Sequence, residues 1–152
     1  MKELVYHRLL LPAIDNNAEK VGFIDGDYSG TYAQHGDRVL RLSSALRIEL
    51  GLSAGDRFAL MATNSHQYLE VYHAAFLGAG VVNPLNLRLA GKELAYIVQN
   101  SGCKVAFVDA AFADHFLRFQ PGLVQHQHGR RLTVAAEPWR HRHVELRGIR
   151  IG

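Results

Sequence analysis

The sequence predicts an α/β fold built around a doubly wound parallel sheet. Three short apolar runs, at 57–62, 81–82 and 104–109, are typical of strands that a parallel sheet buries on both faces. Segments with helical periodicity lie between these runs. Strands that alternate with helices this closely favour parallel pairing through crossover helices, so we expect a partial doubly wound sheet.

The N-terminal region predicts a short helix followed by a hairpin. Residues 3–14 carry leucine and isoleucine side chains that can share one side of a helix, and Pro12 leaves the end of this helix open. Residues 21–25 are mostly apolar or β-branched, and Gly26-Asp27 follows as a turn. We therefore expect a strand that enters a hairpin.

A long helix is predicted to begin at Thr31. The Thr31 hydroxyl can accept a hydrogen bond from the first turn, and Gln34 stands three residues later, as in a capping box. Gly51 is expected to end this helix. Its apolar residues recur at helical spacing: Val39, Leu42, Leu46 and Leu50.

Two further helices are predicted between the buried strands. Asn64 or Ser65 can cap the first of them, and Gly78-Ala79-Gly80 is expected to stop it. These glycines follow a helix, whereas a dinucleotide-binding loop needs strand, glycines and then helix, so we interpret them as a helix stop. Pro84 should end the next strand, and the second helix is predicted over 92–100.

Residues 74–94, AAFLGAGVVNPLNLRLAGKEL, resemble an early signature of the adenylate-forming enzymes, which include acyl-CoA synthetases, luciferases and peptide-synthetase adenylation domains. TYAQHGDRVLRLSSAL at 31–46 looks like the first core motif of this family, and 55–109 continues in register with it. The resemblance covers about residues 20–117. It identifies the chain as an N-terminal fragment of an AMP-dependent synthetase/ligase and implies a Rossmann-like fold.

The resemblance implies an acid–thiol ligase that acts in two steps. In complete members, ATP and a carboxylic acid give an acyl-adenylate, and a thiol such as coenzyme A then displaces AMP, with Mg²⁺ as the metal. Pro84-Leu85-Asn86 resembles the fatty-acyl or aryl-acid CoA ligases more than the peptide-synthetase domains. Fatty acid metabolism is therefore the expected setting.

The family motifs that handle ATP have no counterpart in this sequence. A triphosphate needs a Ser/Thr/Gly-rich loop with a lysine, yet no such stretch follows Asp109, and Lys104 is the last lysine. The aromatic-Gly-x-Thr-Glu segment, the ribose-binding aspartate and the lid lysine of the family have no counterpart either. We therefore assign no catalytic, cofactor-binding or metal residue, expect no cofactor for this fragment, and expect this truncated chain alone to be inactive.

All of the excess positive charge lies in residues 118–152. This tail carries 7 Arg, no Lys and 2 Glu, a balance of +5, whereas residues 1–117 carry 10 Lys+Arg and 12 Asp+Glu, a balance of −2, so the chain sums to +3. We divide the chain into a truncated ligase region, 1–117, and an irregular Arg/His-rich tail, 118–152, expected to be disordered or frame-shifted. The alternatives are an interrupted gene product and a natural short paralogue.

A non-enzymatic binding module is the alternative function. In that case the basic tail would recruit an anionic partner, although one tryptophan, Trp139, makes nucleic acid an unlikely one. His126-x-His128 and His141-x-His143 could each present two imidazoles to a metal, but the composition of the tail explains them better.

Four other residues that could carry chemistry are interpreted as structural. His66 and His73 lie too far apart along one helix for a single metal and are expected to be surface or half-buried histidines. Cys103 borders an apolar strand and is expected to be a structural thiol. Asp109 follows a predicted strand, where open α/β sheets bind ligands, but we expect a turn or helix-cap residue.

Composition places the chain in a reducing compartment. It has 152 residues, 48% of them hydrophobic, and one cysteine, which excludes an internal disulfide. The apolar cluster near the N-terminus has no small-residue cleavage site after it, and no run approaches the roughly 18–20 residues that a membrane span needs. A cytoplasmic protein is expected.

Overall fold

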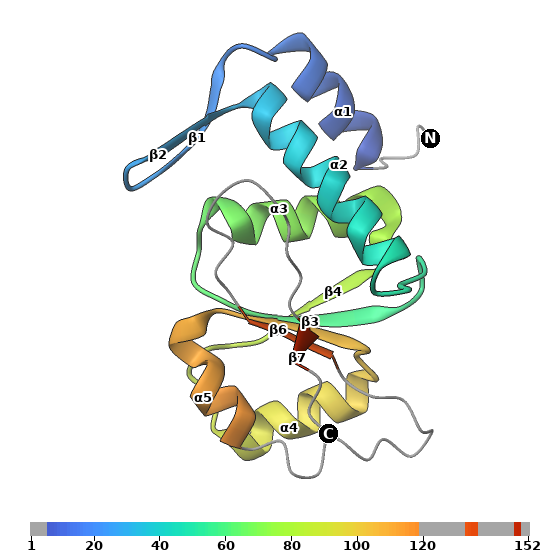
Figure 1. Cartoon of the computed structure of the whole chain (residues 1–152), viewed down its shortest axis with the longest axis vertical. Coiled ribbons are helices and arrows are strands. Elements are labelled where there is room, and N and C mark those ends of the chain that lie inside the picture. The colour runs from blue at the N-terminus through green and yellow to red at the C-terminus, as the bar shows by residue number, and fades with distance from the viewer. Residues whose placement is uncertain (1–5, 119–132, 137–147, 150–152) are drawn as a thin grey trace, which may run out of the picture. The chain divides into compact units, whose positions relative to one another are not determined.

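The computed structural model describes residues 6–118, 133–136 and 148–149, and it confirms the predicted α/β fold (Figure 1). The chain forms two compact units. Unit 1 comprises Met1–Ala54 and Asn64–Gly80, and unit 2 comprises Gly55–Thr63 and Val81–Gly152. Each unit is therefore assembled from two separate stretches of sequence.

Unit 1 begins with a helix and the predicted hairpin. Helix α1 spans His7–Asn16, and strands β1 (Val21–Asp25) and β2 (Tyr28–Thr31) pair in antiparallel register. The observed helix continues past Pro12 for a further turn, to a later end than the sequence analysis expected. Leu10 and Ile14 are buried on this helix and give it an apolar side.

The long second helix, α2 (Tyr32–Ile48), begins with the predicted capping box. The Gln34 amide donates to the Thr31 hydroxyl at 3.2 Å, and the Thr31 amide donates to the Gln34 side chain at 2.9 Å. Two amides that a helix start leaves without partners are thereby satisfied. Of the four predicted apolar positions, Val39, Leu42 and Leu46 are buried, whereas Leu50 follows the observed helix end at Ile48 and is only partly buried.

Helix α1 packs closely against α2 at Gly36. A Cβ atom built on Gly36 would lie 2.8 Å from the Ile14 Cγ2, closer than side chains in contact normally come. Glycine at this position therefore lets the two helices pack without overlap.

We expect Gly36→Ala to lower the free energy of unfolding by about 1 kcal/mol. Overpacking costs ~1–3 kcal/mol, and the better helix propensity of alanine returns up to ~1 kcal/mol. Urea denaturation of Gly36→Ala, Ile14→Ala and the double variant measures the coupling between the two sites. If Gly36→Ala costs as much in the Ile14→Ala background as in the wild type, close packing at this point is not the cause.

Helix α3 (His66–Ala74) ends in a single π-helical turn. Ser65 caps its start by accepting from the Tyr68 amide at 3.1 Å, as the sequence analysis allowed. The π-turn η1 spans Ala75–Ala79, and Gly78 within it has φ +84°. Because side chains rarely adopt this left-handed conformation, the predicted glycine stop has a backbone reason.

Unit 2 contains a five-stranded sheet of order β4-β3-β5-β6-β7. Strands β3 (Arg57–Met61), β4 (Val81–Pro84) and β5 (Val105–Val108) correspond to the three predicted apolar runs and are parallel. Phe58 in β3, which lies between β4 and β5, is opposite Val82 of β4 and Val105 of β5. The parallel sheet that the alternating pattern predicted is therefore observed.

Two strands lie in the stretch for which the sequence predicted only an irregular tail. Strand β6 (Thr133–Ala136) pairs in parallel with β5, and β7 (Gly148–Ile149) pairs antiparallel with β6. Val105 of β5 lies opposite Thr133, and the register continues to Val108 and Ala136. The tail thus contributes backbone pairing to the sheet.

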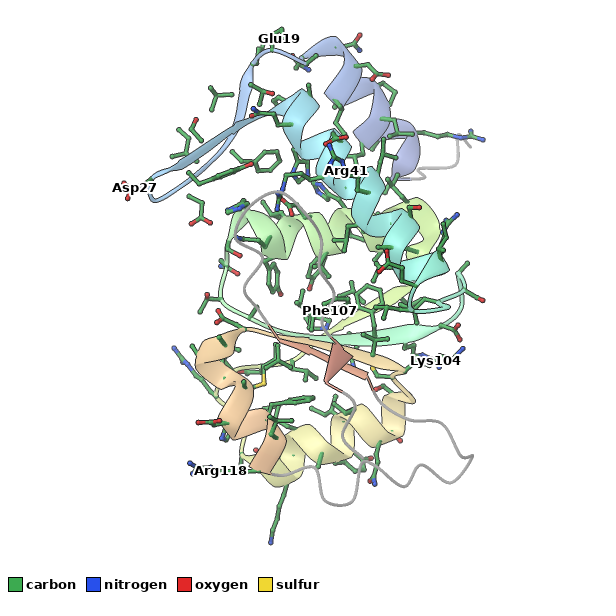
Figure 2. The ribbon with its side chains drawn as sticks, viewed as in Figure 1. Glu19, Asp27, Arg41, Lys104, Phe107 and Arg118 are labelled. Carbon is green, nitrogen blue, oxygen red and sulfur yellow. The ribbon has the colours of Figure 1, made fainter. Side chains whose placement is uncertain are left out.

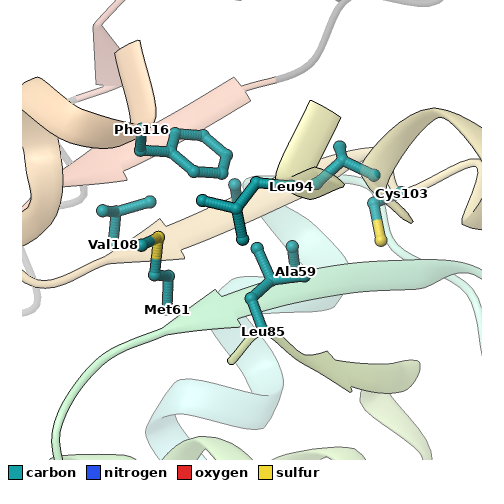
Figure 3. Packing of buried hydrophobic residues seen from close by; sticks show 9 residues of the cluster. Ala59, Met61, Leu85, Leu94, Cys103, Val108 and Phe116 are labelled. Atoms are coloured by element: carbon teal, nitrogen blue, oxygen red, sulfur yellow. The ribbon is translucent and has the colours of Figure 1, made fainter. Parts of the chain in front are cut away.

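Helices α4 (Gly91–Ser101) and α5 (Ala110–Arg118) cover one face of this sheet (Figure 1). Nine buried side chains form the core under them, and Figure 3 shows Leu94 and Phe116 meeting Val108 and Met61. The cluster comprises Ala59, Met61, Leu85, Leu94, Val98, Cys103, Ala106, Val108 and Phe116.

The alternate residues of β3 and β5 are buried as well. Phe58 and Phe107 meet edge to face with ring centroids 5.6 Å apart, and Figure 2 shows Phe107 on the side of the sheet away from α4 and α5. Strands that are apolar on both faces are typical of a parallel sheet, which explains the continuous apolar runs in the sequence.

Candidate functional site

The sheet of unit 2 has a topological switch point between β3 and β5. The chain goes from β3 to β4 on one side and from β5 to β6 on the other. Ligands of open α/β sheets bind outside the carboxyl ends of strands at such a point. Thr63 follows β3 and Asp109 follows β5, and the Thr63 hydroxyl donates to Asp109 Oδ2 at 3.3 Å.

Asp109 acts at this edge as the cap of helix α5. Its Oδ1 accepts from the Ala111 amide at 3.0 Å, and its own amide donates to the Met61 carbonyl at 2.9 Å. The turn or helix-cap role expected from the sequence is therefore observed. The carboxylate satisfies the start of α5 and places a negative charge where a phosphate would otherwise be favoured.

Unit 1 contains a second polar cluster, formed by two histidines that are buried between helices. His35 on α2 is 2% exposed and His73 on α3 is 9% exposed. His35 Nε2 and His73 Nδ1 lie 2.7 Å apart, and His73 Nε2 lies 3.1 Å from the Tyr6 hydroxyl. One face of His35 stacks on Phe23 of β1, with centroids 4.0 Å apart.

Burial acts on the protonation of this pair. Desolvation, together with the charges of His73 and Arg38, lowers the pKa of His35 to about 4. Desolvation also lowers the pKa of His73. Both rings are therefore neutral at pH 7, and the hydrogen bond between them has one donor and one acceptor.

A partly buried ion pair joins the same two helices. Arg38 on α2 donates from Nε and from an Nη to the two oxygens of Glu70 on α3, at 2.6 and 2.9 Å. Glu70 is 4% exposed, and these hydrogen bonds raise the pKa of Arg38. Such a bidentate pair fixes one helix against the other.

An Asp–His contact links the hairpin to the start of α3. Asp25 Oδ2 accepts from the His66 amide at 3.0 Å and from His66 Nδ1 at 2.8 Å. The side-chain hydrogen bond from His66 lowers the pKa of Asp25. The Tyr28 ring stacks on the His66 ring with centroids 3.7 Å apart, so this imidazole is held between the hairpin and the helix.

The structure places the other residues singled out in the sequence as follows. His66 is partly buried as expected, whereas His73 is more buried than expected. It contacts His35, which lies 38 residues away in sequence. Cys103 is buried in the core under α4, as a structural thiol would be. His126, His128, His141, His143 and Trp139 lie outside the described residues.

Neither cluster has the composition of a metal or triphosphate site. Within residues 6–118, 133–136 and 148–149, no three His, Cys, Asp or Glu side chains gather so that they could hold a metal ion. No helix in the described part of the chain is long and apolar enough to cross a membrane. The polar groups of both clusters are used instead to cap and join helices.

Comparison with known proteins identifies the family. The pattern of the family described as AMP-binding enzyme matches residues 12–145. The chain belongs to this family. The match extends beyond the resemblance over 20–117, so it includes strand β6 and much of the basic tail.

The similar proteins are CoA ligases. The chain is 31% identical over 99 residues to 4-hydroxybutyrate–CoA ligase 2 of Metallosphaera sedula, a match that covers 65% of this chain and 18% of that protein. It is 36% identical over 87 residues to a long-chain-fatty-acid–CoA ligase of Mycobacterium tuberculosis, which covers 57% of this chain and 17% of that protein.

A solved structure shows the same fold. The crystal structure of a benzoate CoA ligase from Burkholderia xenovorans superposes with a TM-score of 0.76 and 20% identity, covering 86% of this chain and 25% of that one. This member of the AMP-binding family therefore spans about a fifth of the length of the curated relatives it matches.

Proposed function

We propose that this chain forms the N-terminal framework of an acyl- or aryl-CoA ligase. The observation that supports the proposal is the family match over residues 12–145, together with relatives that are named CoA ligases. The proposed reaction joins a carboxylic acid to coenzyme A through an acyl-adenylate, with ATP and Mg²⁺. We place this reaction in the cytoplasm, as an acid–thiol ligation of fatty or aryl acids.

The framework alone is proposed to be inactive. A triphosphate needs backbone amides and a cation aimed at its charge, and the sequence has no Ser/Thr/Gly-rich loop with a lysine after Lys104. At the switch point, the Asp109 carboxylate occupies the start of α5 and would repel a phosphate. The described residues of this region therefore support a structural role.

Calorimetry with ATP and Mg²⁺ tests this proposal. We expect no heat of binding from the folded 152-residue chain and no AMP release with 4-hydroxybutyrate, benzoate or a long-chain fatty acid plus coenzyme A. A full-length relative in the same buffer serves as the positive control, and circular dichroism checks the fold. Micromolar ATP binding by the folded chain would contradict the proposal. Asp109→Asn, which removes the capping charge, then shows whether the site lies at α5.

A basic binding module is the second candidate. The observation that favours it is the charge of residues 118–152, with 7 Arg against 2 Glu. Binding of heparin at about 50 and about 200 mM salt, compared between the chain and an Arg130→Gln/Arg131→Gln variant, tests it. A module of this kind loses affinity steeply with salt and with these arginines. Equal, weak binding by both proteins would exclude it.

The division of the chain near residue 117 remains a prediction. An interrupted ligase reading frame and a natural short paralogue are its two candidate explanations. The family match through residue 145 and the pairing of β6 with β5 favour the paralogue over the described part of the tail. Sequencing the adjacent downstream DNA distinguishes the two explanations. A phosphate-loop motif in another reading frame supports the interruption, and its absence supports the paralogue.

A further inference from the structure

The contact between the two histidines buried in unit 1 depends on their protonation. His35 Nε2 and His73 Nδ1 are 2.7 Å apart, which leaves room for one hydrogen between them. The neutral pair supplies one donor and one acceptor, and the far nitrogen of His73 is satisfied by the Tyr6 hydroxyl at 3.1 Å. A proton on both rings would set one N–H against another across this distance.

The carboxylates described near the histidine pair already have other partners, so they do not stabilise a charged imidazole. Of the carboxylates described nearby, Glu70 on α3 is engaged by Arg38 on α2, and Asp25 on β1 is engaged by His66 on α3. Tyr28 on β2 stacks on His66, and Tyr6 before α1 bonds to His73. The π-turn after α3 carries no titratable side chain. Phe23 covers one face of His35 and keeps it from water.

We propose that the His35–His73 pair is an acid-sensitive joint, which holds α2 against α3 while both imidazoles are neutral and releases them when the pair takes up protons. The release is local to unit 1, because both helices belong to that unit. Neither histidine has a role in the ligase chemistry proposed above, so the joint is independent of it.

The direction of the pH effect follows from linkage. Both histidines have a pKa below the ordinary value of 6.5 in the folded chain, with His35 at about 4. The unfolded chain therefore binds more protons between those limits, and stability is complete above pH 6.5 and falls as the pH is lowered toward 4. Between about pH 7.5 and about pH 5.5, His35 raises the unfolding equilibrium constant by about tenfold, and His73, whose pKa is also lowered, raises it by at most the same factor.

Urea denaturation of the full chain from about pH 7.5 to about pH 5.5 tests the joint. The informative variant is His35→Gln/His73→Asn, because the new amides can reproduce the hydrogen bond between the two sites without titrating. We expect the unfolding constant of the wild type to rise by up to about 100-fold over this interval for two histidines, and that of the double variant to stay nearly constant. His115→Gln in unit 2 is the matched control and should keep the wild-type slope. An equal slope in the double variant would overturn the proposal.

Two further measurements keep the test decisive if the double variant fails to fold. Imidazole ¹⁵N shifts of the wild type should show the His35 ring uncharged at about pH 6, and a charged His35 ring in the folded chain would refute the joint. Hydrogen exchange, corrected for intrinsic rates, should show the protection of α2 and α3 falling between about pH 7.5 and about pH 5.5 while α4 and β5 keep theirs. Loss of protection in all four elements together would refute a local release.

Discussion

Replacing Leu94 with alanine is expected to destabilise the chain by about 2–5 kcal/mol. Leu94 is 2% exposed and lies in the cluster between α4 and the sheet, where Figure 3 shows it pointing toward the strands. Truncation removes its apolar contacts and leaves a cavity that the neighbouring strands, fixed by their hydrogen bonds, can fill only in part. The midpoint of urea denaturation, at constant slope, measures the loss.

Tyr96→Ala provides the matched control on the same helix. Tyr96 lies two residues further along α4 and is 67% exposed, so its removal leaves no cavity. We expect a change within about 0.5 kcal/mol. If the two variants lose similar stability, core packing would not be the cause of the Leu94 loss, and the role assigned to the cluster under α4 would be wrong.

Arg38→Met is expected to cost about 3 kcal/mol. The substitution keeps an apolar stem but removes the two hydrogen bonds to Glu70, which is 4% exposed and would be left as a buried charge without its cation. We place this expected loss of stability at the low end of the range for buried ion pairs, because a third of the Arg38 side chain is exposed. Chemical denaturation at neutral pH measures it.

Two companion variants separate burial from charge. Arg41 pairs with Asp37 one turn away on α2, but both side chains are exposed, so Arg41→Met should change stability by less than about 0.5 kcal/mol (Figure 2). Arg38→Met combined with Glu70→Leu removes the stranded charge and should recover most of the loss. An equal loss in both arginine variants would show that the Arg38 pair contributes no more than a surface contact.

Features fixed by neighbours in sequence could be predicted, and those fixed by distant partners could not. The capping box depends on two residues three positions apart, so Thr31 and Gln34 were sufficient to predict it. The parallel strands were recognisable because burial on both faces leaves continuous apolar runs. The role of Asp109 as a cap was predictable too, since it follows a strand and precedes the helix it caps.

The polar cluster of unit 1 had no such signal. His35 and His73 are 38 residues apart, and Arg38 and Glu70 are 32 apart, so their pairing depends on how α2 packs against α3. Each residue alone is compatible with an exposed helix surface. Strand β6 was missed for a related reason. Its four residues have a weak strand pattern, and the strand depends on backbone pairing with β5.

The discontinuous make-up of unit 1 sets an order of events during synthesis. Residues 55–63, which belong to unit 2, are translated between the two stretches of unit 1. When α2 leaves the ribosome, Arg38 and His35 therefore have no partners and remain hydrated until α3 follows some thirty residues later. Closure of these contacts comes after β3 has been made, so nascent unit 1 passes through a stage in which its buried polar groups are still bound to water.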